Sequence, residues 1–567
     1  MGILALIGTI LLFLVASYTF QTIFDKSHDH IEEVSTPTIK DIGIGVLKLL
    51  GLLLLFWAFN YFVLFKFNLR YLAIIIYGVA FVILGLQLTY RDFNLAHDYV
   101  VKASSALFGL VVILSIFVYG LFGGRVFLHS EAYSELLHVD EKVFDDDVQT
   151  VDVNTLPIVD KSYGVKLGSL KLGEYPGIGS EFEPGAYSDI IYQGEQYLVS
   201  PLEYRGIFKW LNNNNEGTPG YILINKVTSE TTLVNLSATE DIGLKYTPSA
   251  FFEQDLKRHA YMNGLNKYRF EQSYFEIDES GHPYYILQYS LPTIFLNGGD
   301  DIAKIAVVDA VTGDVDIYDP DDVPDWVESV YPPGLLLQHL DYWGTLQDGW
   351  LNSFLAQRGV LKSSDGKRTI KNNNGLYYFT GLTSAGSDES TIGFVYMNVK
   401  TKEATLYQFP GATEYAAMSK TLTLIPQNNI STSFPIPINV NGSPTYYILI
   451  KGEDGRIIRH VFMNVTDLET YGIAEKKTNA YSDYLLNLGI SNQTNLTNIT
   501  GEITDVTSYV NEGNTIYWVQ IDNDVYYVIN VSTFSFDKMR YFIEKDIGDT
   551  ITIEVQDFTV IDMGDSN

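Results

Sequence analysis

The chain has 567 residues, enough for several domains, and a formal net charge of −31. So acidic a protein repels nucleic acid phosphates, and no Lys/Arg-rich stripe or nucleic-acid motif is present, so we expect no nucleic acid partner. The absence of cysteine excludes disulfides, thiolate zinc sites and cysteine nucleophiles.

The first 125 residues contain four apolar runs that are almost free of charge. Each run has about 18–22 residues, close to the ~20 that a helix needs to cross the hydrocarbon core of a bilayer. We therefore predict a transmembrane region at residues 1–125, with the lipid bilayer as a partner. The predicted helices cover residues 3–20, 44–65, 71–88 and 103–122.

The acidity belongs to the rest of the chain. Residues 1–125 hold 8 Lys/Arg and 7 Asp/Glu, whereas the other 442 residues hold 29 and 61. Basic residues flanking the predicted helices do not decide the orientation, because both orientations place similar numbers inside. Acidity and the absence of cysteine favour a large extracytoplasmic domain, so the sequence predicts a multi-pass membrane protein with that domain outside.

A strand–turn–strand pattern recurs in the acidic part. An apolar strand ends in Asn or Asp, followed by two residues, Thr, one residue, Glu or Asp, and a second strand. The clearest copies have their turns at Asn225, Asp309 and Asn398, and looser copies follow at Asn464 and Asn530. The Asn or Asp side chain can bond the following backbone and start the turn, with help from the Thr hydroxyl. Repetition at this spacing predicts tandem modules. Candidate helices precede hairpins at 249–265, 323–330, 347–358 and 415–421, and a further strand, beginning with Gly194-Glu195-Gln196, precedes the first hairpin.

The predicted fold class is a multidomain membrane protein. It combines the four-helix transmembrane region with α+β and β-rich tandem hairpin modules and a small C-terminal β domain, for which a barrel is conceivable. The predicted parts after residue 125 are an acidic linker at 126–163, β module 1 at 164–248, α+β module 2 at 249–333, α+β module 3 at 334–425, β module 4 with a polar linker at 426–500, and the β domain at 501–567.

Module 2 resembles a PepSY-type module over residues 251–318. The resemblance rests on a predicted helix, on a strand that opens at Pro283-Tyr284-Tyr285-Ile286, and on the closing turn, where Asp309 and Gly313 match the family's most recognisable element. The hairpins at Asn225 and Asn398 are similar more loosely, since they lack the glycine. The resemblance implies a non-catalytic, extracytoplasmic or membrane-attached module that inhibits or restrains partner proteins.

Two groups of side chains could bind metal ions. Carboxylates suit calcium, which prefers oxygen ligands, and imidazoles suit transition metals. The calcium candidates are Asp316, Asp319, Asp321, Asp322 and Asp325. The transition-metal candidates are His28 and His30. An ordinary solvated acidic loop accounts for either group without a metal.

The sequence contains no Gly-x-Ser-x-Gly elbow, P-loop or His-Glu-x-x-His motif. We therefore predict no catalytic and no cofactor-binding residues. The leading hypothesis is a membrane-anchored, non-catalytic binding, scaffold or regulatory protein that contacts a protein partner or itself. The alternatives are a membrane-bound hydrolase with a site between modules, and a subunit of a larger membrane complex.

Overall fold

The computed structural model describes Tyr61 and residues 123–564, apart from 296, 365, 367, 373–374, 385–389, 490–495, 512–513, 523–524 and 557–558. Apart from Tyr61, the four predicted transmembrane segments and the two candidate metal ligands His28 and His30 lie outside the described residues. Contacts divide the chain into two compact units, with the boundary in the sequence between Glu469 and Thr470.

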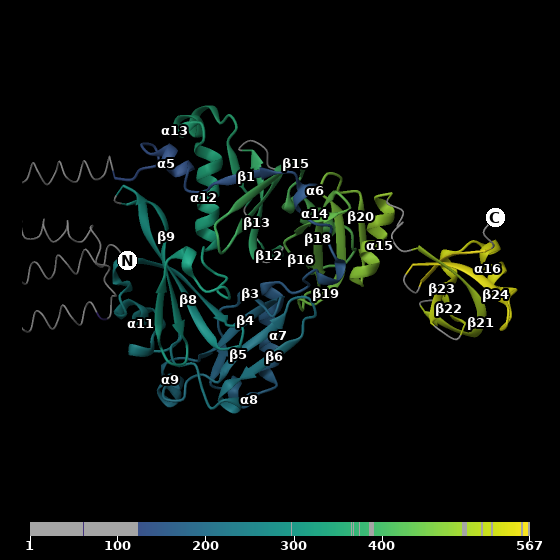
Figure 1. Ribbon diagram of the computed structural model, residues 1–567, viewed down its shortest axis with the longest axis horizontal. Coiled ribbons are helices and arrows are strands. Elements are labelled where there is room, and N and C mark those ends of the chain that lie inside the picture. The colour runs from purple at the N-terminus through teal and green to yellow at the C-terminus, as the bar shows by residue number, and fades with distance from the viewer. Residues whose placement is uncertain are drawn as a thin grey trace, which may run out of the picture. The chain divides into compact units, whose positions relative to one another are not determined.

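None of the helices in the described part of the chain is both long and apolar enough to cross a membrane. The longest of them, α12 (Pro333–Leu346), has 14 residues, against the ~20 that a span needs. On this finding we correct the prediction of a multi-pass protein with a four-helix transmembrane region, in both fold class and localisation. The described chain is instead built mainly of antiparallel strands (Figure 1).

The first sheet has the strand order β2-β4-β5-β6, and β3 also pairs with β4. All of these pairs are antiparallel. Helix α7 (Lys161–Gly173) packs on it, and the Asp160 side chain caps the helix by accepting the backbone N–H of Tyr163 at 2.8 Å. The strands are β2 (Phe182–Pro184), β3 (Ser188–Tyr192), β4 (Glu195–Tyr204), β5 (Gly220–Asn225) and β6 (Thr231–Asn235).

The second sheet is an antiparallel meander with the order β10-β9-β8-β7. It follows the short helix α11 (Leu256–Met262) and shares buried cores with both neighbouring sheets. This sharing fits the expectation that a small sheet needs a neighbour to bury its apolar face. The strands are β7 (Arg269–Ile277), β8 (Pro283–Ile294), β9 (Gly298–Asp309) and β10 (Val315–Tyr318).

The third sheet has the order β1-β15-β14-β13-β11, with β12 also paired to β13. Its first strand, β1, comes from the predicted acidic linker and runs parallel to β15. Helix α12 packs in the core that this sheet shares with the second sheet. The strands are β1 (Val139–Lys142), β11 (Leu361–Ser363), β12 (Arg368–Asn372), β13 (Gly375–Ser384), β14 (Ser390–Asn398) and β15 (Ala404–Ala412).

In the fourth sheet, β18 pairs antiparallel with β16, β17 and β19. Helix α14 (Glu414–Thr423) precedes it, with Thr413 as its N-cap. The predicted helix at 415–421 is therefore confirmed, whereas 323–330, also predicted helical, contains none. The strands are β16 (Ser431–Thr432), β17 (Ile436–Val440), β18 (Ser443–Lys451) and β19 (Ile457–Asn464).

The second unit contains β20 (Tyr471–Ala474), helix α15 (Lys477–Asn487) and a closed barrel with the order β21-β22-β23-β25-β24, coloured yellow in Figure 1. Helix α16 (Phe536–Ile543) packs Met539 and Phe542 into the barrel core. The barrel strands are β21 (Leu496–Asn511), β22 (Asn514–Ile521), β23 (Tyr526–Asn530), β24 (Thr550–Gln556) and β25 (Thr559–Met563).

Short helical turns connect these elements. They are α5 (Ser130–Ser134), α6 (Phe144–Asp147), η1 (Val153–Thr155), α8 (Pro176–Gly179), α9 (Ile207–Asn213), α10 (Leu236–Thr239), η2 (Phe252–Gln254), η3 (Leu265–Lys267), η4 (Pro320–Asp322), α13 (Gly349–Leu351), η5 (Asn352–Ala356) and η6 (Val531–Thr533). The predicted helix at 347–358 corresponds to α13 and η5, and the one at 249–265 to η2 and α11.

The repeated turns have the chemistry predicted from the sequence. The side-chain oxygen of the turn Asn or Asp accepts the backbone N–H groups two and three residues further on. The distances are 2.9 and 3.0 Å at Asn225, 2.8 and 2.9 Å at Asp309, 2.8 and 3.0 Å at Asn398, and 2.8 and 3.1 Å at Asn464. This part of the repeat prediction is confirmed.

The three clearest turns each contain a residue with left-handed backbone. It is Gly313 in the second sheet (φ 84°), but Ser229 in the first (φ 63°) and Lys402 in the third (φ 66°). The left-handed conformation costs a residue with a Cβ about 1–2 kcal/mol. Glycine avoids this cost, but it loses more backbone entropy on folding, which offsets part of the gain. We expect Ser229→Gly to raise the free energy of unfolding by ~0.5–1 kcal/mol, measured by urea denaturation.

Gly313 is also required because the structure leaves no space for a side chain at this position. A substitution there should therefore have the opposite effect to Ser229→Gly. A Cβ on Gly313 would lie 2.3 Å from the ring of Tyr246. We expect Gly313→Ser to be destabilising, in contrast to Ser229→Gly. Lys402→Gly is not a matched variant, because it would also remove the ion pair between Lys402 and Asp301. Destabilisation by Ser229→Gly would show that the left-handed backbone is not a source of strain in that turn.

Candidate functional site

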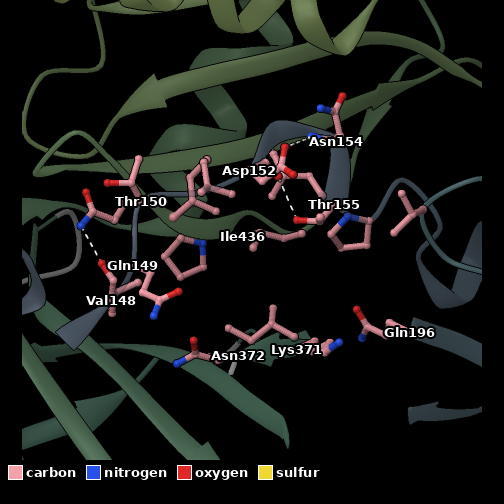
Figure 2. A pocket seen from close by; sticks show the side chains of 18 of the residues that line it. Val148, Gln149, Thr150, Asp152, Asn154, Thr155, Gln196, Lys371, Asn372 and Ile436 are labelled. Carbon is pink, nitrogen blue, oxygen red and sulfur yellow. Dashed lines mark hydrogen bonds between the residues drawn. The ribbon is translucent and has the colours of Figure 1, made fainter. Parts of the chain in front are cut away.

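A cavity of about 570 Å³ opens between the first, third and fourth sheets, within the first unit (Figure 2). Its volume falls in the range of about 300–1,000 Å³ that is typical of small-ligand sites. We call it the β12 cavity, after the strand that contributes residues 370–372. The other lining residues come from 148–157, from 194–196, from the turn at 227–228, from Tyr396 on β14 and from 436–439 on β17.

The stretch 148–157, which the sequence predicted as part of a linker, forms one wall of the cavity. It is fixed to β17 by two hydrogen bonds: the N–H of Val151 donates to the Asn439 carbonyl at 3.0 Å, and the Asn439 side chain donates to the Val148 carbonyl at 2.7 Å. Asp152 accepts the N–H of Asn154 at 2.9 Å and starts the short helix η1. The wall is therefore ordered by specific contacts.

The edge of strand β17 at the cavity offers no free backbone hydrogen-bonding groups at Pro437 and Asn439. Pro437 has no N–H to offer, and its carbonyl accepts the Tyr396 hydroxyl at 3.1 Å. The next outward carbonyl, on Asn439, is the one bonded to Val151. Donors and acceptors that are free to bind a ligand must therefore belong to other elements of the cavity.

The charged groups of the cavity are Asp152, Glu195 and Lys371. Glu195 accepts the side-chain amide of Asn225 at 2.6 Å, and Lys371 donates to the Gly194 carbonyl at 2.5 Å. No histidine, serine or cysteine lies among the lining residues that the structure describes. The charged side chains are thus engaged in holding the walls.

Gln196 differs from these residues because its side chain is unsatisfied. It is 5% exposed, and its Nε2 has no hydrogen-bond partner among the described residues. Figure 2 shows its amide at the border of the cavity, facing inward. An unsatisfied buried donor costs about 1–3 kcal/mol, which a bound acceptor would recover. In the described part of the chain, Gln149, Thr150 and Asn372 also line the cavity with no side-chain hydrogen bond.

A buried ion pair lies next to Gln196 in the first sheet. Lys226 Nζ is 2.5 Å from Asp189 Oδ1, with the two side chains 4% and 7% exposed, and the N–H of Lys226 donates to the Gln196 carbonyl at 2.9 Å. Burial alone would raise the pKa of Asp189, but the Lys226 and Lys161 ammonium groups hold it below its usual value. The ion pair therefore supports the backbone that presents Gln196.

A buried pair of glutamates lies between the second and third sheets. Glu276, fully buried on β7, accepts the backbone N–H groups of Glu328 and Ser329 at 2.8 and 2.9 Å. Burial, reinforced by the Glu276 carboxylate, raises the pKa of Glu328 to about 8. No cavity residue belongs to this pair, so we assign it a structural role.

The structure spreads the predicted calcium ligands around the end of the second sheet. Asp316 lies on β10, Asp321 and Asp322 lie in η4, and Asp319 is paired with Lys304 at 2.7 Å. The carbonyl of Asp325 accepts Lys400 at 2.7 Å. In the described ranges, no group of three or more His, Asp or Glu side chains is arranged to hold a metal ion.

No protein-family model and no curated protein matches the chain. The site is therefore interpreted from its own residues. Sequence reasoning did not identify Gln196, Asn372 or the wall at 148–157, because the cavity residues are dispersed along the chain and share no local motif. The one available signal was Gly194-Glu195-Gln196, which the sequence already places at the start of a strand.

Proposed function

We propose that the protein is a non-catalytic binding or regulatory protein whose ligand occupies the β12 cavity. The observation that carries this proposal is the buried, unpartnered amide of Gln196 at the border of a ligand-sized cavity. The uncharged side chains of Gln149, Thr150 and Asn372 add further donors and acceptors there. The resemblance of 251–318 to PepSY-type modules supports a regulatory role toward a protein partner.

A hydrolase with a site between modules has less support. Catalysis by a carboxylate requires a group free to exchange protons with a substrate. In the cavity, Asp152 already caps η1 through the N–H of Asn154, and Glu195 holds the side chain of Asn225. Both carboxylates thus help to hold the cavity walls, which supports the binding proposal.

The proposal is tested by ligand-induced stabilisation of the full chain. The probes are tripeptides with and without a lysine, trisaccharides and nucleosides, each at millimolar concentration. A probe present at ten times its dissociation constant should stabilise the protein by ~1.4 kcal/mol, which raises the melting temperature by a few degrees. We expect at least one class to do so, and Gln196→Leu to lose most of that shift.

Gln408→Leu is the matched control, because Gln408 is exposed on β15 and lies outside the cavity. It should respond to the probes like the parent protein. Probe shifts that persist in Gln196→Leu, or that disappear equally in both variants, would rule out the β12 cavity as the binding site. So would the absence of a shift with every probe class.

A further inference from the structure

Strand β12 has a free edge within the described residues. It pairs with β13 on one side and with no other strand. Lys371 lies opposite Leu376 in that pairing, yet the carbonyl of Leu376 accepts the N–H of Val399, which follows β14 on the other side of β13. In an antiparallel pair, this leaves the N–H and C=O of Lys371 directed away from β13.

This free edge borders the cavity. Ile370, Lys371 and Asn372 all belong to its lining, as Figure 2 shows for the two labelled residues Lys371 and Asn372. An unpaired strand edge is a template for another extended chain. The opposite strand, β17, cannot act in this way, because Pro437 and Asn439 already have partners.

The side chains around the edge complement a peptide backbone. The amides of Gln196, Gln149 and Asn372 each carry a donor and an acceptor, as a peptide unit does. The apolar side chains of Ile370 and Ile436 can receive alternate side chains of an extended segment. Backbone pairing at the edge would fix the register, and these groups would supply specificity.

Other ligand classes fit less well. The one aromatic side chain of the described lining, Tyr396, is 2% exposed, so it offers no free ring face for stacking a nucleobase. Two carboxylates, Asp152 and Glu195, face a single cation, Lys371, which disfavours phosphate groups. The same balance, in a chain with a net charge of −31, favours a ligand that carries a positive charge.

We infer that the ligand is an extended peptide segment of another protein, bearing a basic residue, which adds to β12 as an extra strand. This inference rests on the proposed function and specifies its partner. The peptide backbone would pair with the N–H and C=O of Lys371 that point away from β13. One peptide carbonyl would accept a hydrogen bond from Nε2 of Gln196.

The test begins with 12-residue peptides selected from a random display library against the full chain. Lys371→Pro removes the outward N–H and, on an edge strand, leaves the pairing with β13 possible. Lys371→Ala loses the same side chain but keeps the N–H. We expect Lys371→Pro to weaken binding of the selected peptide at least tenfold, and Lys371→Ala less than threefold. Raising the salt concentration should weaken binding.

Backbone N-methylation of the peptide gives a second readout. Methyl groups at alternate amides should abolish binding in one register and be tolerated in the other, because successive N–H groups of a strand point to opposite sides. Equal binding by Lys371→Pro and Lys371→Ala, or indifference to the methylation register, overturns strand addition. If no peptide is selected but a saccharide or nucleoside stabilises the protein through Gln196, the inference fails while the proposed function stands.

Discussion

Replacing Asp189 with alanine is expected to lower the free energy of unfolding by about 3–5 kcal/mol, the typical cost of leaving a buried ion without its partner. The ion left behind is Lys226, whose side chain is 4% exposed. Arg368 lies near enough to repel it, and Lys161, 3.9 Å from Asp189, carries the same charge and cannot replace the carboxylate. The loss should be visible in equilibrium urea denaturation.

A double variant shows how much of the destabilisation comes from the interaction between Asp189 and Lys226 and how much from removing either side chain. Asp189→Leu combined with Lys226→Met replaces both ions by apolar side chains and should remain within about 1–2 kcal/mol of the parent. Glu174→Ala breaks the exposed pair with Lys171 and should change stability little. If the double variant is as unstable as the sum of its single variants, the two groups do not act as a buried unit.

Stability should also fall as the pH rises through about 8, because of Glu328. Its pKa is about 8 in the folded protein, against about 4.3 in an unfolded chain. A folded-state pKa above the unfolded value means that its stabilising contribution is complete below pH about 4 and is lost as pH rises through about 8. Burial also raises the pKa of Glu276, so that carboxyl acts in the same direction. We expect Glu328 to account for a loss on the order of 3 kcal/mol between pH 5 and pH 9.

Glu328→Gln is the decisive variant for this pH dependence. The amide stays neutral at every pH, so the unfolding free energy of this variant should fall less with pH than that of the parent. Glu216→Gln makes the same change of charge at an exposed position and serves as the control. Parallel stability curves for Glu328→Gln and the parent, from urea denaturation at pH 5, 7 and 9, would refute the assignment.

The hairpins could be predicted because their information is local. A turn that starts at Asn225, Asp309 or Asn398 depends on one side-chain oxygen and the next few backbone N–H groups, all within six residues. The sequence also showed a glycine at 313, but it could not show that Ser229 and Lys402 adopt the same left-handed backbone. That conformation is imposed by the paired strands on either side.

Helix α7 could not be predicted, because the residues that fit it to its sheet weaken the helix signal. A Cβ on Gly168 would lie 1.8 Å from the Tyr187 hydroxyl, and one on Gly164 would lie 2.6 Å from a methyl carbon of Leu198. Both glycines are therefore needed for close packing, yet each lowers helix propensity by about 1 kcal/mol. Contacts with the sheet therefore stabilise this helix despite its low intrinsic propensity.

The candidate site could not be predicted from the sequence for a different reason. Gln196 and Asn372 are unremarkable in their own strands, and the cavity exists only because 148–157 returns to β17. Charge alone predicts a solvated linker for the acidic stretch that includes Asp145 and Asp147. Tyr407 of the third sheet donates to Asp147 at 2.5 Å, so part of that charge is used in a specific contact.

The pairing of β1 with β15 determines when the cavity can form in a growing chain. Val139 lies opposite Ala404, so the earlier strand must wait for most of the first unit to be synthesised before its partner exists. Contacts this distant in sequence form slowly, because a long loop has to close first. Residues 148–157 follow β1 and reach their own partner, β17, later still. A ribosome-bound chain that has not reached this stage therefore lacks the β12 cavity, and the cavity forms late in synthesis.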